Sequence, residues 1–378
     1  MRALHVHRIA GIGGSERHLL TLLPALRALE IEPLFAGLDV PGAGADVFYA
    51  ELDRAAIPYL RVRAARDLAP DVPFRLARAI RELDATLVHT HLVHADVYGA
   101  LATLPRRVPL VSTKHNDDPF RTRAFRFVER GLVARARSVI AITETLRRFL
   151  VVRLGLPEEK IEVIRYGLDV LPRAWGHNPP LDLPEGSRML LAIARLVEQK
   201  GLDTAIRALP AIHSAHPDVV LVIAGDGPER ERLAALAREL GVADAVRMPG
   251  RAGDVAEWLA RAELLVHPAR WEGFGLVLLE AMLAGVPAVA SAVSAIPEVV
   301  AEGETGVLVP PDDPDALAQA IGALLTDTSL RSRLGTAARE RARRVFSVER
   351  MARETAALYR RVLSPAASTT ASAHDSTE

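Results

Sequence analysis

Two acidic residues eight positions apart, Glu272 and Glu280, have the types and surroundings needed to bind hydroxyl groups of a sugar. Glu272 begins a glycine-rich stretch, and the helix expected from about Gly275 places Glu280 beyond its first turn, among leucines and alanines. A carboxylate in apolar surroundings is costly unless it is paired, and vicinal hydroxyls would satisfy both of its oxygens. The alternatives are a buried ion pair between Glu280 and an arginine, and a solvated loop position for Glu272. The expected helix start also leaves backbone N–H groups free for the same ligand, which adds Gly273, Phe274, Gly275 and Leu276 as candidates.

Two cations stand where a phosphate group could be bound. Arg195 follows an expected strand at residues 189–194, and Lys200 comes five residues later, just before an expected helix at 202–213. A guanidinium and an ammonium beside a helix N-terminus form a strong receptor for a diphosphate, and such a receptor needs no metal ion. The alternative is a pair of ordinary surface cations.

A glycine turn, GIGGSE at residues 11–16, separates the first expected strand from the first expected helix. Gly13 and Gly14 would let the backbone approach a phosphate at the helix start. The turn matches the dinucleotide fingerprint G-x-G-x-x-G poorly, because Glu16 stands three residues after Gly13. The alternative is a plain turn with Ser15 as the helix N-cap.

Histidines gather after two neighbouring strands. His89, His91 and His94 could be taken for a metal site, but no acidic or sulfur ligand follows at a supporting spacing, and we expect no metal. His115 follows the strand expected at 110–113, at the carboxyl edge of the sheet, where an imidazole could exchange a proton with a hydroxyl acceptor. The alternative is a packing histidine. The one D-x-D match, Asp313 to Asp315, is better explained as a helix cap.

The elements that must position these residues alternate almost from end to end, as apolar runs and amphipathic stretches typical of βα units. A Pro- and Gly-rich segment divides them into two series. We therefore expect an α/β protein with two Rossmann-like parallel-sheet domains facing across a cleft, where open sheets of this kind bind ligands. The expected parts are a first Rossmann-like domain at 1–170, a linker at 171–186, a second Rossmann-like domain at 187–344, a helix at 345–363 and a disordered tail at 364–378.

Composition excludes several classes of protein. The chain has 378 residues, 49% of them hydrophobic, and equal numbers of Lys+Arg and Asp+Glu, 47 each. This supports a buried core and gives no overall field that would draw the chain onto nucleic acid. The absence of cysteine rules out thiolate metal sites and cysteine nucleophiles. We expect a protein without a signal peptide or membrane span, located in the cytoplasm.

Taken together, these residues resemble glycosyltransferase family 4, retaining nucleotide-sugar glycosyltransferases of the GT-B fold. The resemblance covers about residues 1–363. It rests on E-x7-E inside WEGFGLVLLEAMLAGVPAVAS, on ARLVEQKG with Ala194 where the family usually has glycine, on IAGDGPER, on GGSERH, and on the histidine segments THLVHADVYG and STKHND.

The resemblance implies that residues 1–170 form the acceptor-side domain and residues 187–344 the nucleotide-sugar-binding domain. It also implies roles for the candidate residues. Arg195 and Lys200 would hold the donor diphosphate, Glu280 the ribose and Glu272 the donor sugar, helped by the backbone of Phe274, Gly275 and Leu276. Gly13 and Gly14 would flank the phosphates, His115 would lie near the transferred sugar and the acceptor, and the last helix would cross back to the first domain. The implied reaction transfers a sugar from a UDP- or GDP-sugar to a hydroxyl acceptor with retention and without a metal.

Other functions remain open at this stage. A sugar-nucleotide epimerase or hydrolase would use a similar fold, a non-catalytic sugar-nucleotide sensor would keep the binding residues, and a dehydrogenase is supported only by the glycine turn. The basic stretch at 121–137 mixes cations with phenylalanines, which could give a weak peripheral contact with anionic lipid at the inner face of the membrane. The alternative for this stretch is an exposed helix whose apolar stripe faces the core.

Overall fold

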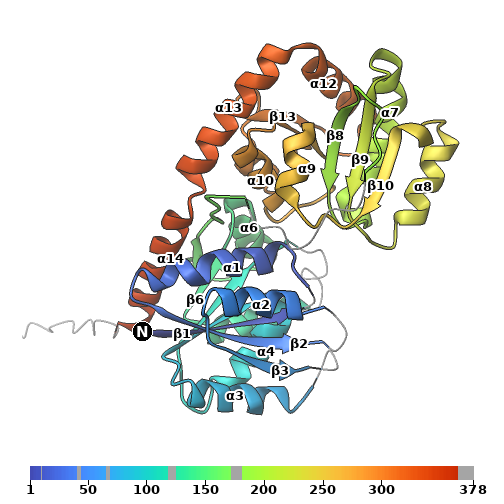
Figure 1. Cartoon of the computed structure of the whole chain (residues 1–378). Coiled ribbons are helices and arrows are strands. Elements are labelled where there is room, and N and C mark those ends of the chain that lie inside the picture. The colour runs from blue at the N-terminus through green and yellow to red at the C-terminus, as the bar shows by residue number, and fades with distance from the viewer. Residues whose placement is uncertain (10, 41–43, 65–68, 118–124, 172–180, 365–378) are drawn as a thin grey trace, which may run out of the picture.

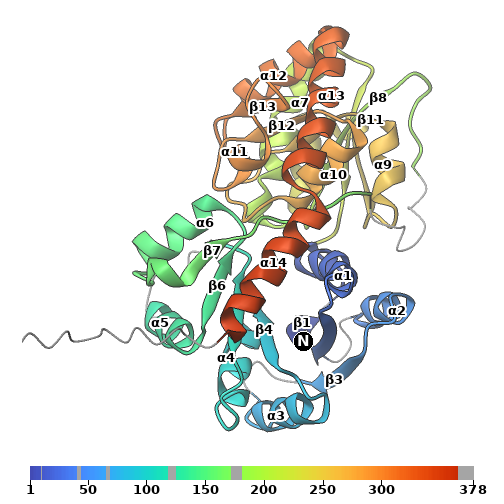
Figure 2. The same cartoon turned by 90° about the vertical axis from the view of Figure 1, so that its left-hand side faces the viewer.

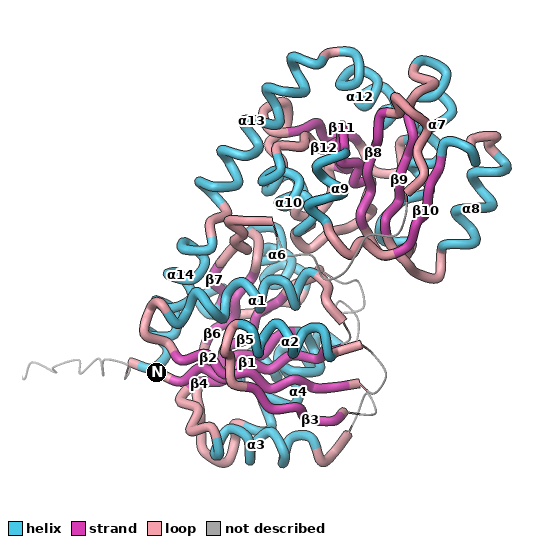
Figure 3. The backbone as a smooth tube through the Cα atoms, in the orientation of Figure 1, coloured by secondary structure: helices cyan, strands magenta, loops and turns pink. Residues whose placement is uncertain are grey.

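In the computed structural model the chain forms two parallel β-sheets, each covered by helices (Figures 1 and 3). The structure describes residues 1–9, 11–40, 44–64, 69–117, 125–171 and 181–364. The first sheet has the order β3-β2-β1-β4-β5-β6-β7. Its strands are β1 (Arg2–Ile9), β2 (Glu32–Asp39), β3 (Tyr59–Arg63), β4 (Leu87–His91), β5 (Leu110–Lys114), β6 (Ser138–Ala141) and β7 (Ile161–Val163).

Helices connect these parallel strands, as a parallel sheet requires. They are α1 (Gly14–Arg27), α2 (Asp46–Arg54), α3 (Val72–Glu82), α4 (Leu92–Ala102), α5 (Phe125–Arg135) and α6 (Glu144–Arg148). Helix α2 is absent from the sequence-based expectation. Only Phe48, Tyr49 and Leu52 of this helix are buried, so its apolar signal is short.

The second sheet has the order β10-β9-β8-β11-β12-β13 and is also parallel throughout. Its strands are β8 (Arg188–Ile193), β9 (Val219–Ala224), β10 (Val246–Gly250), β11 (Ala262–His267), β12 (Ala288–Ser291) and β13 (Gly306–Val309). Every residue of β9 is buried, because helices cover both faces of a parallel sheet. The helices of this half are α7 (Leu202–Ala215), α8 (Arg230–Glu239), α9 (Val255–Arg261), α10 (Leu276–Ala284), α11 (Ile296–Val299), α12 (Pro314–Thr326) and α13 (Thr328–Val345).

The last helix, α14 (Val348–Leu363), returns to the first half of the chain and packs against α1 (Figure 2). Ser347 caps its N-terminus by accepting a hydrogen bond from the Arg350 amide. Gly167, just past β7, lies so close to this turn that a Cβ there would be 2.4 Å from the Ser347 carbonyl oxygen. The chain therefore joins the two halves twice, once before β8 and once between α13 and α14.

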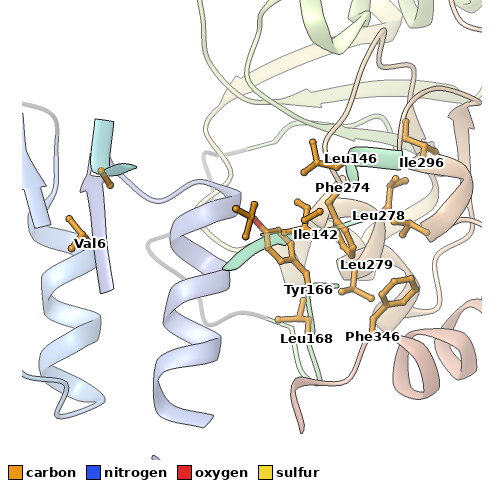
Figure 4. Close-up of a cluster of buried hydrophobic side chains, with 14 of the residues drawn as sticks. Val6, Ile142, Leu146, Tyr166, Leu168, Phe274, Leu278, Leu279, Ile296 and Phe346 are labelled. Carbon is orange, nitrogen blue, oxygen red and sulfur yellow. The ribbon is translucent and has the colours of Figure 1, made fainter. Parts of the chain in front are cut away.

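Apolar side chains from both halves belong to one continuous core, which extends across the contact between the halves (Figure 4). Phe274, which precedes α10, is 2% exposed, and its ring lies 5.0 Å from that of Tyr166 and 5.7 Å from that of Phe346. Tyr166 follows β7 and Phe346 follows α13. The segment around Phe274 is thus held in place by both halves of the molecule. We call this region the interdomain contact.

Three expectations need comment. Gly13, and not Ser15, is the N-cap of α1, because the Glu16 side chain reaches back to the Gly13 amide. Asp313 is the N-cap of α12, as expected, and accepts a hydrogen bond from the Ala316 amide. Most of the expected linker, the expected disordered tail from residue 365 and the start of the basic stretch lie outside the described residues. None of the described helices is long and apolar enough to cross a membrane.

Candidate active site

The Glu272 carboxylate lies at the end of β11, at the edge of the interdomain contact. Its Oε2 accepts a hydrogen bond from Lys200 Nζ at 2.5 Å and lies 3.1 Å from His267 Nε2. Burial alone would raise the pKa of Glu272, but the Lys200 charge and the His267 hydrogen bond outweigh it and hold the pKa far below its ordinary value. Glu272 is therefore a carboxylate at physiological pH. Its other oxygen, Oε1, has no hydrogen-bond partner among the residues that the structure describes.

Glu280 is fully buried in α10, one turn inside the helix. Its Oε1 forms an ion pair with Arg17 Nη1, from α1 of the other half, so the ion pair considered as an alternative is present. Its Oε2 is buried and has no partner within the described ranges, and neither has Arg17 Nε. Burial raises the pKa of Glu280, and Arg17 opposes that effect only partly. One oxygen of each glutamate thus lacks a partner among the described residues.

Lys200 and Arg195 differ in how far they are already paired. Lys200 is bound to Glu272, whereas Arg195 is exposed and its guanidinium has no ion pair or side-chain hydrogen bond within the described part of the chain. Gly201, directly after Lys200, has φ +57°, and a Cβ there would lie 2.0 Å from the Pro268 carbonyl oxygen. Only glycine allows the Lys200 turn to approach the end of β11 this closely.

The glycine stretch before α10 brings the two halves into contact. A Cβ at Gly273 would lie 2.1 Å from the carbonyl oxygen of His115, which follows β5 of the first sheet. Gly275 is the N-cap of α10 with φ +78°, a conformation that glycine adopts without strain. The structure therefore places His115 next to the Glu272 loop. The side chain of Phe274 is used for packing, which leaves its backbone as the part that could touch a ligand.

His115 uses both ring nitrogens within the protein. Its Nε2 lies 3.2 Å from His91 Nδ1, and its Nδ1 is hydrogen-bonded to the Tyr166 hydroxyl. His91 and His89 share a face of the sheet, with ring centroids 4.2 Å apart, but their third neighbour is His5 of β1 and not His94. His94 bonds to Arg8 instead.

One backbone N–H group of the glycine turn before α1 is already hydrogen-bonded to a side chain of that helix. The Gly13 amide donates to Glu16 Oε2 at 2.9 Å, and Glu16 Oε1 lies 3.1 Å from His7 Nε2. Burial would raise the pKa of Glu16, but the His7 hydrogen bond and charge prevail and lower it. A Cβ at Gly14 would meet nothing within 4 Å, so the space beside Gly14 is open. Of the two glycines, Gly14 is the one whose surroundings can admit a phosphate.

A separate hollow of about 300 Å³ opens on the second half, lined by Glu198, Asp203, Glu229, Arg232 and Arg270. Arg270 pairs with Asp203 at 3.0 Å, and Arg232 pairs with Glu229. Because both arginines of this hollow are already paired with its acids, it is a poorer receptor for a phosphate than the exposed Arg195.

Sequence reasoning missed Arg17 and His267. His267 stands at the carboxyl end of its strand, the same signal that identified His115, and the signal could have found it. Arg17 lies inside the GGSERH segment, but its partner Glu280 is 263 positions away, and only the fold shows the pair.

Comparisons with known proteins agree with this fold. The second half matches the family "Glycosyl transferases group 1" over residues 176–341, and the first half matches "Glycosyltransferase Family 4" over residues 12–170. The molecule is a GT-B glycosyltransferase. The chain belongs to glycosyltransferase family 4.

Relatives of known name support this assignment. The chain is 32% identical to glycogen synthase of Mycobacterium tuberculosis, over 81% of this chain and 72% of the relative. It is 31% identical to alpha-maltose-1-phosphate synthase of the same organism, over 93% and 96%. It is 34% identical to D-inositol 3-phosphate glycosyltransferase of Kribbella flavida, over 75% and 73%.

Solved structures of the same fold cover nearly the whole chain. HepE of Anabaena, in complex with UDP and glucose, has a TM-score of 0.82 at 23% identity and covers 96% of this chain and 100% of its own. Sucrose-phosphate synthase of Thermosynechococcus elongatus has a TM-score of 0.78 at 23% identity and covers 96% and 98%. At these identities the likeness concerns the fold.

Proposed function

We propose that this glycosyltransferase transfers a sugar from a nucleoside diphosphate sugar, a UDP- or GDP-sugar, to a hydroxyl acceptor with retention of anomeric configuration. The proposal rests on two carboxylates that each have only one of their two oxygens paired. Glu272 and Glu280 each spend one oxygen on a cation and leave the other without a partner in the described structure. Hydroxyl groups of a sugar and of a ribose are the donors that would complete them.

The diphosphate fits the cations beside these carboxylates. Arg195 is exposed and unpaired among the described residues, and Lys200 keeps two further ammonium hydrogens besides the one given to Glu272. As the bond between the sugar carbon and the phosphate oxygen breaks, its electron pair passes to the leaving diphosphate, and these cations stabilise the developing charge. They supply positive charge without a divalent cation, which supports a metal-independent reaction.

The acceptor side belongs to the first half of the chain. The acceptor oxygen forms the new bond to the sugar carbon on the face that the phosphate leaves, and its proton passes to the leaving phosphate oxygen. His115, beside the Glu272 loop, takes a supporting role, since both of its ring nitrogens are engaged. Gly14 and the backbone of Gly273, Phe274, Gly275 and Leu276 complete the proposed donor contacts.

Three solved neighbours, all crystal structures of HepE, contain UDP, UDP with glucose, or UDP-glucose. They make uridine nucleotides the first to test. Isothermal titration of UDP and GDP against the wild type and Glu280→Gln tests the ribose role. We expect micromolar binding to the wild type and at least tenfold weaker binding to the variant, because a neutral amide replaces the charged acceptor. Glu239→Gln, an exposed change on α8, is the matched control.

Equal affinities in Glu280→Gln and the wild type would contradict the ribose role. Two further measurements test the finer parts of the proposal. Product analysis by NMR with candidate acceptors and without them separates transfer from hydrolysis, because hydrolysis releases free sugar in either case. Activity in the presence of EDTA tests metal independence.

A further inference from the structure

Buried side chains inside the first sheet and the helix α14 packed on it form an unbroken chain of hydrogen bonds, of which the proposed mechanism uses only His115. It starts at Tyr166, in the interdomain contact, and passes inward through three imidazoles. The Tyr166 hydroxyl bonds to His115 Nδ1, His115 Nε2 lies 3.2 Å from His91 Nδ1, and His91 Nε2 lies 3.1 Å from His5 Nδ1.

The chain then reaches the last helix. His5 Nε2 lies 3.2 Å from the Tyr359 hydroxyl, which lies 2.5 Å from His89 Nδ1, and His89 Nε2 lies 2.7 Å from Thr113 Oγ1. We call this series the histidine chain; its members, in order, are Tyr166, His115, His91, His5, Tyr359, His89 and Thr113. Each of the seven is 5% exposed or less.

Its members come from five segments that meet only in the folded protein. His5 lies on β1, His89 and His91 on β4, and Thr113 and His115 on β5 or directly after it. Tyr166 follows β7. Tyr359 alone comes from α14, the helix that crosses back from the second half (Figure 2). The chain is therefore complete only when α14 is docked on the first sheet.

The protons in such a chain are coupled. Burial holds the pKa of His5 at about 3 and those of His89 and His91 well below their ordinary value, and it raises the pKa of Tyr166 and Tyr359. These imidazoles are neutral at physiological pH, so each carries one N–H and one acceptor nitrogen. His115 lies between Tyr166 and His91 in the same series of hydrogen bonds.

Each link of the histidine chain holds one proton, so all donors must point the same way along it. Turning one ring alone would place two N–H groups face to face at one link and two lone pairs at another. In a buried site such unsatisfied groups are costly, because they lose their hydrogen bonds to water without gaining new ones. Two concerted arrangements satisfy every link, and the direction in which the Tyr359 hydroxyl donates distinguishes them. Donation to His5 Nε2 places the His115 proton on Nδ1, and donation to His89 Nδ1 places it on Nε2.

We propose that Tyr359 is a positioning residue of the glycosyl transfer: through His5 and His91 it fixes which ring nitrogen of His115 carries the proton. The role rests on the proposed function, because His115 lies beside the Glu272 loop where the sugar would be transferred. This role of Tyr359 makes sugar transfer on the first half depend on the docking of α14, the helix that arrives from the second half.

A buried metal ion is the rival explanation for these imidazoles. One nitrogen from each of His5, His89 and His91 lies within 4.8 Å of the others. The hydrogen bonds favour the histidine chain, because every ring nitrogen of these three residues already has a side-chain partner. Metal analysis of the purified wild type decides between them, and one tightly bound metal ion per protein molecule would overturn the proposal.

Tyr359→Phe removes one hydroxyl from the middle of the histidine chain and keeps the ring. Tyr49→Phe is the matched control: Tyr49 is 2% exposed in the same half, and its hydroxyl donates to Asp39, outside the histidine chain. In the ligand-free protein, ¹⁵N NMR of labelled histidines, assigned with His115→Gln, reports the tautomer of His115. We expect one tautomer in the wild type and in Tyr49→Phe, and a mixture of two in Tyr359→Phe.

Kinetics give the second readout. Relative to Tyr49→Phe, Tyr359→Phe should lower kcat by about tenfold, less than the hundredfold or more that acid–base groups themselves supply, while UDP affinity and donor KM stay the same. An unchanged His115 tautomer in Tyr359→Phe, or a kcat equal to that of the control, would overturn the proposal. Failure of the proposed function would show separately, as absent UDP and GDP binding to the wild type, because the NMR comparison needs neither ligand nor activity.

Discussion

At the residue scale, the site is built from charges that satisfy each other only in part. Glu272 and Glu280 each have a cation on one oxygen, and Arg17 and Lys200 have hydrogen-bonding capacity left over. A fully paired structural ion pair would leave no such capacity. Half-satisfied charges of this kind are what a polar ligand would complete.

The Lys200 ammonium is the group on which the proposed charge stabilisation depends most. Lys200→Ala should lower kcat/KM by about 100- to 1,000-fold, the range seen when one donor to a developing anion is removed. Lys160→Ala is the control, since that ammonium is also hydrogen-bonded, to carbonyl groups of the first half. Steady-state kinetics with a saturating acceptor measure the effect, and a loss below tenfold would rule out the proposed role.

Arg17 should control the protonation of Glu280. Burial raises the pKa of Glu280 and Arg17 opposes it, so Arg17→Gln should raise that pKa further. As the pH falls, the variant would then protonate Glu280 before the wild type does, and its UDP affinity would begin to decline at a higher pH. Titrations at three pH values test this, with the exposed Arg207→Gln as control; parallel pH profiles would contradict it.

Individual residues could be predicted from the sequence where type and local position carry the signal. Glu272, Lys200 and His115 all follow strands, and the fold brings their segments together. The Arg17–Glu280 pair could not be predicted, because it depends on how α1 and α10 meet across the two halves. The same holds for the link from His5 to Tyr359, residues 354 positions apart.

At the element scale, helix α10 has a glycine in the left-handed conformation at each of its ends. Gly275 and Gly285 have φ +78° and +75°, and the helix between them matches the expected residues. Strands that are buried on both faces, such as β9, could also be predicted, since their apolar runs are continuous. The short helices α2 and α11 could not, because each buries only a few side chains.

The closeness of the α10 loop to the first half can be tested at Gly273. Gly273→Ala would place a Cβ 2.1 Å from the His115 carbonyl oxygen, so the two halves must move apart. We expect kcat/KM to fall by at least tenfold with the fold retained. The control is Gly322→Ala within α12, where nothing lies within 4 Å and alanine should stabilise the helix by about 0.5–1 kcal/mol. Equal activities in the two variants would contradict the close contact.

Helix α5 is the described part of the basic stretch proposed to touch lipid. Phe127 and Val128 are 61% and 46% exposed, so its apolar side chains do not all face the core. Phe127→Ser should reduce sedimentation with anionic vesicles at low salt, whereas Phe74→Ser, an equally large change at a more exposed site on α3, should not. Equal sedimentation of both variants and the wild type would argue against a lipid contact through α5.

At the scale of the whole molecule, two sheets are joined by shared apolar packing and by a helix that crosses back. Phe274 packs against side chains from both halves, and Tyr359 carries the crossing helix into the first core. The general architecture follows from the alternating pattern of the sequence. The relative placement of the halves does not, because it depends on side-chain contacts over long separations.

Buried neutral histidines should make the whole fold sensitive to acid. Burial lowers the pKa values of His5 and His18 from 6.5 to about 3. Between these pH values the two histidines are therefore protonated in the unfolded chain but not in the folded protein. The free energy of unfolding keeps the full contribution of these histidines above pH 6.5 and decreases as the pH falls toward 3. The decrease at pH 5 is roughly 2 kcal/mol for each histidine.

Urea unfolding at pH 8, 6.5 and 5 measures this dependence. His18→Gln should show a shallower loss than the wild type, and His216→Gln, at a half-buried position beside Arg188 of the second half, should not differ from it. A midpoint that stays constant from pH 8 to pH 5 would show that these histidines are not held neutral.

The central claim is that the interdomain contact binds a nucleoside diphosphate sugar through Glu280, Lys200 and Arg195. A crystal structure with bound UDP tests it most directly. We predict ribose hydroxyls on the oxygen of Glu280 that has no partner here, and diphosphate oxygens within hydrogen-bond distance of Lys200 and Arg195. UDP bound instead in the hollow beside Arg232 and Arg270, with Glu280 still paired only to Arg17, would contradict it.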